Sequence, residues 1–330
     1  MKENPSGLFY PDGTFATQSE IKRKLVVDSF SETSRVDSLT APVRTFDRWT
    51  DIMIRRQEER EEVLPLPESV RVNIATEKPI LIALMADDHI GGEGTDYKRM
   101  KKDVELIKEA EGYTVTFGDL TNSAFFMPDA GDQISTGEEQ VLYARTMLEE
   151  LSNGGHLLAG WGGDHDLWGK DKGGAHTMYS QFRDRYNAHY LEGISYLTIE
   201  LTSKKGVIEY PLVGSHRHKG FSVYNDAHAS WRQQLDEANS VNDILSVTAH
   251  NHIKSYLEQT RKTYGGESKT IHSIALGAYK GTDRYSRKMG WPRQTDKSMG
   301  AFGLILYPNK QELSVHWTIE EAVKQLELLK

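Results

Sequence analysis

Two patterns of apolar positions alternate along the chain from residue 79 onward. Short continuous apolar runs predict buried strands, and segments in which apolar residues recur every three or four positions predict helices. The expected strands cover 80–86, 114–118, 156–161, 196–201, 207–214, 244–249, 273–279, 302–307 and 313–317, and the expected helices cover 96–110, 138–151, 176–188, 226–239 and 318–329. Strands that alternate with helices in this way indicate an α/β fold.

The first 78 residues lack this alternation. Trp49, Ile52 and Met53 lie at helical spacing ahead of a charged run, so one helix is expected over 47–62, and two prolines follow it. We therefore divide the chain into an N-terminal arm, 1–78, and a main domain, 79–330, whose part from residue 253 onward is rich in strands. The arm either docks on a partner protein, a second copy or the main domain, or is a flexible leader.

Composition narrows the chemistry. The net charge is -8, so a nucleic-acid surface would have to be a local patch. There is no cysteine, which excludes disulfides, thiolate zinc sites and cysteine nucleophiles. The start of the chain lacks a signal-peptide pattern, and no run approaches the ~18 apolar residues of a membrane span. We expect a cytoplasmic protein that makes no membrane contact.

Five short motifs follow expected strands and contain half of the chain's twelve histidines. They are Asp87-Asp88-His89, Gly118 to Asn122, Gly163 to Asp166, Gly214 to His218, and His250-Asn251-His252. Because sites in open α/β sheets lie beyond the carboxyl ends of strands, the shared position predicts a single site. Carboxylates and imidazoles bind divalent metals, and two such ions about 3.5 to 4 Å apart can promote in-line displacement at phosphorus. Asp119, alone at a strand end, is the best candidate for a bridging ligand.

The order of these motifs, D-x-H, G-D-x-x-N, G-x-H-D, H and H-x-H, resembles that of the calcineurin-like metallophosphoesterase superfamily over about residues 80–256. The resemblance implies an α/β fold of two sheets packed as a sandwich, here with an N-terminal extension, and a dinuclear metal site at the sandwich edge. The ligands that it implies are Asp87, His89 and His252 for one ion, Asp164, His216 and His250 for the other, and Asp119 between them. It also implies that His165 protonates the leaving group or stabilises transition-state charge, with Asp166 orienting its ring.

Two positions depart from the family pattern. Asp164 stands where the family usually has asparagine, and its extra negative charge should hold the metal more tightly while making it less electrophilic. Ala249 replaces a glycine before the last motif, which is tolerable unless that turn needs a positive φ. Manganese is the expected metal for both sites, and iron, zinc and nickel stay open because Asp and His ligate all of them.

The fourth motif contains two candidate ligands, His216 and His218. We favour His216 because it lies closer to the strand end. His218 would then face the substrate phosphate together with Arg217 and Lys219, and Asn122 is also assigned to the substrate.

A second candidate for substrate binding is the segment 280–297, which is rich in Lys and Arg and includes Lys280 and Arg284. Tyr279, Tyr285 and Trp291 accompany these charges, and aromatic side chains can stack on bases while basic groups neutralise phosphates. The alternatives are a solvated loop beside the site and a protein-docking loop.

The leading hypothesis is a phosphoesterase that hydrolyses phosphodiesters, with DNA or RNA as candidate substrates, by direct attack of a metal-bound hydroxide. Two alternatives stay open: a phosphomonoesterase or protein phosphatase of the same fold, and a structural or assembly protein that retains the metal site. The leader and the segment GAYKGTDRYSRKMG also resemble phosphoesterases encoded by bacteriophages, which would place the protein in a host cytoplasm.

Overall fold

The computed structural model describes residues 45–63, 67–123, 130–166, 182, 185–220, 222, 224–237, 244–262, 266, 268–288, 290, 294–295 and 298–329. The chain divides into two units, Met1–Pro65 and Leu66–Lys330. In the first unit, helix α2 (Phe46–Val63) confirms the helix expected over 47–62. None of the helices in the described ranges is long and apolar enough to cross a membrane.

The division between the units differs from the boundary expected at residue 78. Strand β1 (Ser69–Ala75), which lies within the residues expected to form the arm, pairs in parallel with β6 (Ser195–Ser203). Val70 and Ile74 of β1 are buried while their neighbours face outward. The alternation of S-V-R-V-N-I-A is a strand signal of period two, and the arm therefore ends near residue 65.

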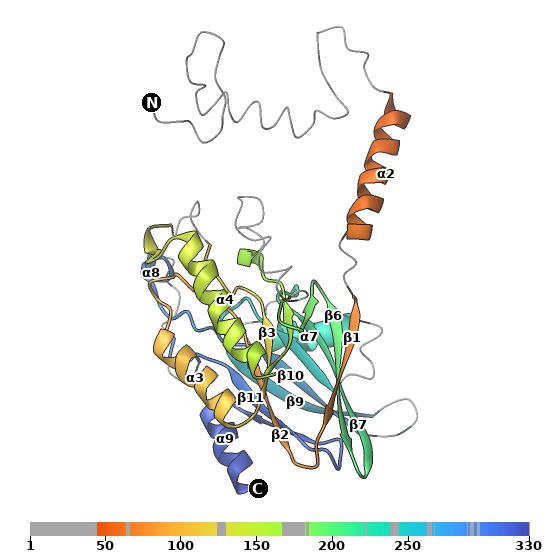
Figure 1. Cartoon of the computed structure of the whole chain (residues 1–330), viewed down its shortest axis with the longest axis vertical. Coiled ribbons are helices and arrows are strands. Elements are labelled where there is room, and N and C mark those ends of the chain that lie inside the picture. The colour runs from red at the N-terminus through yellow and green to blue at the C-terminus, as the bar shows by residue number, and fades with distance from the viewer. Residues whose placement is uncertain are drawn as a thin grey trace. The chain divides into compact units, whose positions relative to one another are not determined.

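Two mixed sheets form the second unit (Figure 1). The first sheet has the order β1, β6, β7 (Gly206–Ser215), β8 (Leu245–Thr248), β10 (Ser268–Ala275) and β9 (Ser255–Lys262). The second has the order β12 (Leu313–His316), β11 (Phe302–Leu306), β2 (Ile80–Met85), β3 (Tyr113–Phe117), β4 (Leu157–Trp161) and β5 (His189–Leu191). Strands β2, β3 and β4 run parallel, so their carboxyl ends meet at one edge. The predicted two-sheet α/β architecture is confirmed.

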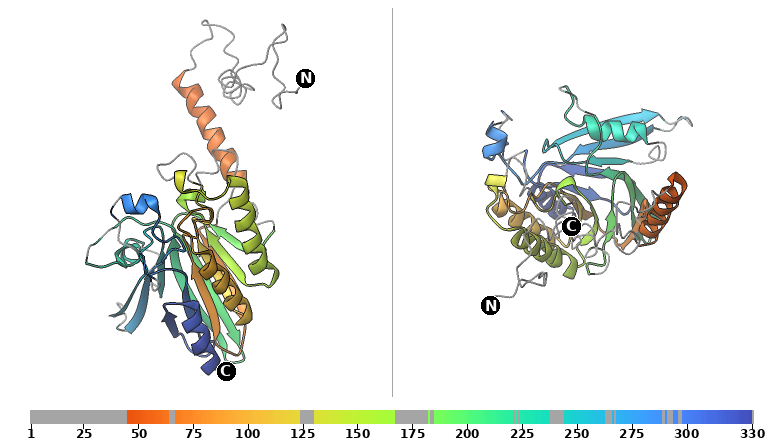
Figure 2. Two further views of the ribbon diagram at one scale, coloured as in Figure 1. Left: turned by 90° about the vertical axis from the view of Figure 1, so that its left-hand side faces the viewer. Right: turned by 90° about the horizontal axis from the view of Figure 1, so that it is seen from above.

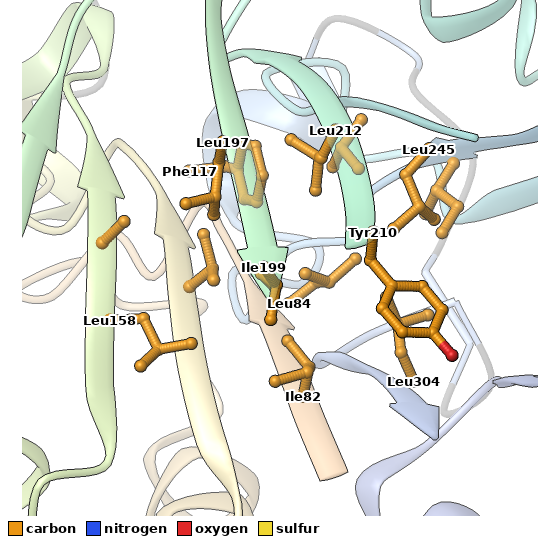
Figure 3. Close-up of a cluster of buried hydrophobic side chains, with 14 of the residues drawn as sticks. Ile82, Leu84, Phe117, Leu158, Leu197, Ile199, Tyr210, Leu212, Leu245 and Leu304 are labelled. Carbon is orange, nitrogen blue, oxygen red and sulfur yellow. The ribbon is translucent and has the colours of Figure 1, made fainter. Parts of the chain in front are cut away.

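The apolar faces of the two sheets pack against each other (Figure 3). Ile82 and Leu84 of β2 meet Leu197 and Ile199 of β6 in this core, together with Phe117 of β3. Strand β2 is buried along its whole length, whereas β6 alternates buried and half-buried positions. The difference follows from the layers, because β2 is covered on both faces and β6 on one.

The second face of β2 lies under helices. Leu81, Ala83 and Met85 join a separate core with side chains from α3 (Tyr97–Glu109), α4 (Gly137–Asn153) and α9 (Ile319–Leu328). Figures 1 and 2 show α3, α4 and α9 along the outer side of this sheet. Helix α7 (His228–Asp236) packs on β8 and β10 of the first sheet.

Helix caps agree with the sequence. Asp96, expected to cap the helix over 96–110, accepts a hydrogen bond from the backbone N–H of Arg99 at 3.0 Å. Thr136 and Glu139 form a reciprocal capping box at the start of α4. Such caps satisfy amides that have no partner inside the helix.

Several elements differ from expectation. The strand expected over 273–279 instead covers Ser268–Ala275, and the chain beyond it runs beside the motif loops, where the Tyr279 amide donates to the Asp87 carbonyl oxygen at 3.1 Å. The edge strand β9 was not predicted because its apolar residues are few and its exposed positions are polar or charged. Three short elements were also not expected, namely β5, the 3-10 turn η1 (Ala130–Asp132) and helix α8 (Arg284–Lys288). Most of the helix expected over 176–188 lies outside the described residues.

Candidate metal centre

The five motifs meet where strands of both sheets end. In the second sheet, the Asp87 amide donates to the Gly118 carbonyl at 3.0 Å, and the His89 amide donates to the Asp119 carbonyl at 2.9 Å. A bond between the sheets runs from the His250 amide to Oδ2 of Asp87 at 3.0 Å. These backbone contacts bring loops from distant parts of the sequence to one place, as the strand-end positions predict.

Five of the candidate ligands have a left-handed backbone conformation: Asp87, His89, Asp119, His250 and His252, with φ of 50°, 45°, 54°, 73° and 54°. Residues other than glycine rarely adopt this conformation, and they hold it only where surrounding contacts enforce it. Such strain concentrates at functional sites. Ala249 is not among the residues with positive φ, so alanine fits at the position where the family has glycine.

We call Asp87, His89 and His252 the inner half-site. The two Nε2 atoms of His89 and His252 lie 2.9 Å apart. Oδ1 of Asp87 lies 3.4 Å from Nε2 of His252 and 3.9 Å from Nε2 of His89. This oxygen is buried and has no hydrogen-bond partner among the described residues. One carboxylate oxygen and two imidazole nitrogens thus lie close together, and the oxygen has no hydrogen-bond partner among the described residues. A cation bound between the three atoms would satisfy it.

We call Asp164, His216 and His250 the outer half-site. Nδ1 of His250 lies 3.6 Å from Oδ2 of Asp164. Nδ1 of His216 lies 2.6 Å from the carbonyl oxygen of Phe117. Because a carbonyl only accepts, Nδ1 carries a proton, and Nε2 is the ring atom that could bind a metal. The buried Nε2 has no aligned hydrogen bond among the described residues.

Asp119 lies between the two half-sites. Its Oδ2 is 3.1 Å from Nε2 of His216 in the outer half-site and 3.9 Å from Nε2 of His89 in the inner one. Its Oδ1 accepts a hydrogen bond from the His165 amide at 2.8 Å. One carboxylate therefore faces both groups, which is the position expected of a bridging ligand.

The donor distances fit metal ligation. Bonds of about 2.0 to 2.2 Å place two ligands of one ion no more than about 4.4 Å apart, and every donor pair above lies within that limit. Sets from Asp87, His89 and His252, from His89, Asp119 and His165, and from Asp119, His216 and His250 each place one ligand atom per residue within 4.8 Å of the others. Asp and His together suit divalent ions of the first transition row.

Burial and neighbouring charge give the two half-sites different protonation states in the metal-free protein. Burial lowers the pKa of His89 well below its usual range, and the neighbouring His252 and His165 lower it further. For His216, burial acts in the same direction, but Asp119 outweighs it and raises the pKa to about 10. In return, although burial alone would raise it, the charge of His216 holds the pKa of Asp119 below its usual range.

The contacts of His165 and Asp166 differ from the expected roles. Nδ1 of His165 lies against the carbonyl oxygen of Asn122. The Asp166 carboxylate instead accepts from the amides of Asp119, Leu120 and Gly163 at 2.8, 3.1 and 3.0 Å. The expectation that Asp166 orients His165 is therefore corrected: Asp166 ties two motif loops together. Burial and then Asp119 raise the pKa of Asp166 to about 7 against these amides.

The fourth motif separates its two histidines. His216 points its Nε2 at Asp119, whereas Nε2 of His218 lies 4.0 Å from Oδ2 of Asp236 on α7. His218 is buried there, so the expectation that it faces a substrate phosphate is corrected. Arg217 is exposed, and its Nη1 lies 3.4 Å from Oδ2 of Asp164. The arginine is thus at the outer half-site, where it faces solvent.

The residues of the basic segment 280–297 differ in burial and in their contacts. Lys280 is buried, with Nζ 3.2 Å from Oδ1 of Asn122 and 3.0 Å from Oδ2 of Asp283. Tyr279 is fully buried, and its hydroxyl donates to Asp103 at 2.7 Å, so it stacks on no base. Arg284 on α8 is exposed, with Nε 4.0 Å from Oδ1 of Asp132. Trp291 and Lys297 lie outside the described residues.

The burial of Asp88 and the backbone contacts of the histidines were not predicted from the sequence. Asp88 is fully buried, and neither carboxylate oxygen has a hydrogen-bond partner among the described residues. Burial and then the charge of Asp87 raise its pKa well above the usual range. An acidic doublet directly after an apolar run was the available signal. Backbone carbonyls that position the histidines give no sequence signal at all.

Two further side chains of types found at such sites, His156 and Trp161, have structural contacts. His156 lies with Nδ1 2.7 Å from the Gly112 carbonyl oxygen, away from the five motifs. Trp161 is buried and stacks on Phe117 with ring centroids 4.6 Å apart, which makes it core rather than a cleft wall. Trp168 lies outside the described residues.

Comparisons with known proteins find only solved structures of weak similarity. No protein-family model matches the sequence, and no curated protein matches it. A solved structure of the calcineurin-like phosphoesterase YfkN from Bacillus subtilis is similar at 11% identity and a TM-score of 0.36, covering 77% of this chain and 96% of that chain. GAP50, the anchor in the inner membrane complex of Plasmodium, is similar at 10% identity and a TM-score of 0.36, covering 77% and 95%.

At this level of similarity neither structure carries an inference about activity, which has to come from the site itself. The structure itself shows two mixed sheets packed as an α/β sandwich, with the five ordered motifs converging at their strand ends.

Proposed function

We propose that the protein is a phosphoesterase that uses two divalent ions to hydrolyse phosphodiesters, with nucleic acid as the substrate class. The observation that supports it most is Asp119, whose carboxylate faces His89 on one side and His216 on the other. Oδ1 of Asp87, which is buried without a hydrogen-bond partner among the described residues, and Nε2 of His216, which faces Oδ2 of Asp119 at 3.1 Å, are the donor positions that two ions would occupy.

The residues would divide the work as follows. The inner half-site and Asp119 would hold one ion, and the outer half-site and Asp119 would hold the other. Two bound ions supply Lewis acidity and activate a water for in-line displacement at phosphorus. The backbone would hold the donors in place, since five of the ligands lie at positions of positive φ that surrounding contacts must enforce.

His165 is the proposed proton donor to the leaving oxygen. The Asn122 carbonyl at its Nδ1 can only accept, so Nδ1 carries a proton and Nε2 is the atom that would exchange one with the substrate. The ring lies edge-on to His89 with centroids 4.6 Å apart, which places it beside the inner half-site. Its backbone amide donates to Asp119, so the donor and the bridging ligand are held together.

Preference for a phosphodiester rests on positive charge outside the metal centre. Arg284, Arg287 and Lys288 of α8 are all exposed and lie at positions i, i+3 and i+4 of one helix. Side chains at this spacing share a face. The segment that carries α8 is tied to the loop after the first motif, because the Gly281 amide donates to the Gly94 carbonyl at 2.8 Å. A diester in a nucleic acid has flanking phosphates that this helix could bind, and a small monoester has none.

The test is an assay of purified, manganese-loaded protein on single-stranded DNA, on single-stranded RNA and on p-nitrophenyl phosphate. Cleavage of a nucleic acid that Asp119→Ala abolishes would support the proposal. Activity on p-nitrophenyl phosphate alone would favour the phosphomonoesterase reading. Metal binding without activity on any substrate would favour a structural role for the site.

A further inference from the structure

Lys280 is a buried cation directly behind the inner half-site. It follows β10, and its backbone pairs with that of Thr95, so the residue is fixed to the loop that follows the first motif. Its ammonium lies 3.2 Å from Oδ1 of Asn122 and 3.0 Å from Oδ2 of Asp283. An ammonium group donates hydrogen bonds and accepts none. Whatever atom of Asn122 faces it must therefore be an acceptor.

This requirement fixes the amide of Asn122. If the amide were reversed, Nδ2 would face the ammonium of Lys280, and two donors would meet in a buried place. The oxygen that faces Lys280 also lies 2.9 Å from Nδ1 of His89. Since Oδ1 can only accept, Nδ1 of His89 must carry the proton. The ammonium of Lys280 can only donate, so it determines the orientation of the Asn122 amide. The amide in turn determines which ring nitrogen of His89 carries the proton.

The tautomer of His89 decides whether it can bind a metal. With the proton on Nδ1, the lone pair of a neutral ring is on Nε2, which points at Nε2 of His252 and at Asp87. Without Lys280, the amide of Asn122 could turn and donate from Nδ2 to Nδ1 of His89. The ring would then carry its proton on Nε2, where a metal could not bind. Hydrogen bonds to the second ring nitrogen commonly set the tautomer of metal-binding histidines.

We propose that Lys280 is a positioning residue for the inner half-site, which fixes the amide of Asn122 and so holds His89 in the tautomer that leaves Nε2 free for a divalent ion. The proposal rests on the metal centre described under the proposed function. It assigns to Lys280 a structural role in place of the direct substrate contact that its place in the basic segment suggested. It also explains why a lysine is buried at this position together with Asp283, which offsets its charge.

The test measures the tautomer directly. Metal-free protein labelled with 15N in histidine is examined by NMR through the two-bond couplings of the imidazole, and His89→Gln identifies the His89 signals. The wild type should show His89 as a single tautomer with the proton on Nδ1. Lys280→Met should give a mixture of tautomers or the Nε2-protonated form. Lys98→Met, which removes an exposed lysine of α3, is the control and should leave the spectrum of His89 unchanged.

Metal titration gives a second readout. Lys280→Met should weaken binding of Mn²⁺ to the inner half-site by about 10- to 100-fold, the usual range for loss of a group that orients a ligand, and should leave the other ion's affinity near that of the wild type. If Lys280→Met is unstable because Asp283 is left unpaired, the double variant Lys280→Met/Asp283→Asn removes both charges and tests the same point.

Two results would overturn the inference: a wild-type His89 with its proton on Nε2, or variants that keep both the tautomer and the affinity. Failure of the proposed function looks different, because it would leave the Nδ1-protonated tautomer intact in a protein that binds no divalent ion or hydrolyses no phosphate ester.

Discussion

The inner and outer half-sites share Asp119 and offer similar ligands, yet they are embedded differently. In the inner half-site the side chains of Asp87 and His89 are 0% and 2% exposed. In the outer one, His250 and Asp164 are 30% and 34% exposed. Behind the inner half-site lie Asn122 and buried Lys280, whereas the outer one borders exposed Arg217. The third ligands are closer in exposure, with His252 at 22% and His216 at 4%, so the cluster combines a mostly buried ligand set with a partly exposed one.

The half-sites also differ in the protonation state of one histidine in each, His89 and His216. His89 is neutral at neutral pH in the metal-free protein, because burial lowers its pKa. His216 is protonated, because Asp119 raises its pKa to about 10 in spite of burial. An ion that enters the inner half-site finds a free lone pair, and an ion that enters the outer one must displace a proton. The difference should appear in affinity, exchange and pH dependence.

The largest effect should come from the residue that the half-sites share. Asp119→Ala removes a ligand from both, so both ions should be lost and phosphoesterase activity should fall by about a thousandfold or more, since the metals supply several kcal/mol of transition-state stabilisation. Metal content by mass spectrometry and the rate of hydrolysis measure this. Glu105→Ala, an exposed carboxylate of α3, is the control. Retention of one full equivalent of metal would show that Asp119 does not bridge.

His165 lies beside the inner half-site. A substitution of His165 tests whether it is a further ligand there, in addition to Asp87, His89 and His252. His165→Asn should lower the rate on substrates with poor leaving groups by about a hundredfold or more, the usual contribution of a general acid. The metal content should not change. Substrates with a p-nitrophenolate leaving group should be less affected, because that group departs without a proton. A loss of metal in His165→Asn would instead make His165 a ligand.

Asp119 and His165 show which features of the site can be predicted from the sequence and which cannot. The pattern of apolar positions predicted most strands and helices of the main domain, and the five motifs predicted which side chains would meet, because strand ends determine both. Asp119 lies where its motif predicted. The prediction that Asp166 contacts the His165 ring was wrong. The group that faces the ring is the backbone carbonyl of Asn122, and the types of residue in a sequence do not show where backbone carbonyls lie.

The misassigned residues have a related cause. Lys280 was expected at the substrate because it lies in the basic segment 280–297, and His218 because it belongs to the fourth motif. Both are buried, with the acidic partners Asp283 and Asp236. Local sequence gives the charge of a side chain and not the side to which it points. The strand β1 was missed for the opposite reason, since its period-two pattern was present and stood outside the region in which strands were expected.

The half-sites should lose their metals at different rates. His250→Ala removes an outer ligand and His252→Ala removes an inner one, and each should abolish binding at its own half-site while the other keeps its ion. In the wild type, a chelator should remove the outer ion first, because its ligands are more exposed, with rates that differ by at least about tenfold. Timed chelation with metal analysis measures this. Equal rates, or loss of the inner ion first, would show that burial does not govern exchange here.

The pH dependence of binding follows from the two histidines. Below pH 10, each ion that binds His216 displaces one proton, so affinity at the outer half-site should rise about tenfold per pH unit from pH 6.5 to 8.5. His89 loses no proton in that range, so His89 adds no pH dependence to the affinity at the inner half-site. Calorimetry in buffers of different ionisation enthalpy counts the protons released. Equal proton release at both half-sites would contradict the assigned protonation states.

The smallest effect should come from the residue that sets this chain apart from the family pattern. Asp164 adds a negative charge to the outer half-site, and Arg217 offsets part of it at 3.4 Å. Asp164→Asn should weaken metal binding there by a few fold and make the bound ion more electrophilic, so the rate at saturating metal should rise by a similar factor. Because both side chains are substantially exposed, solvent screens the effect and keeps it small. Arg217→Ala should act in the opposite direction, with tighter metal binding, since it leaves the Asp164 charge uncompensated. If both variants shift the affinity in the same direction, the two side chains act through substrate or folding, and the charge of Asp164 does not explain why the outer half-site differs from the inner one.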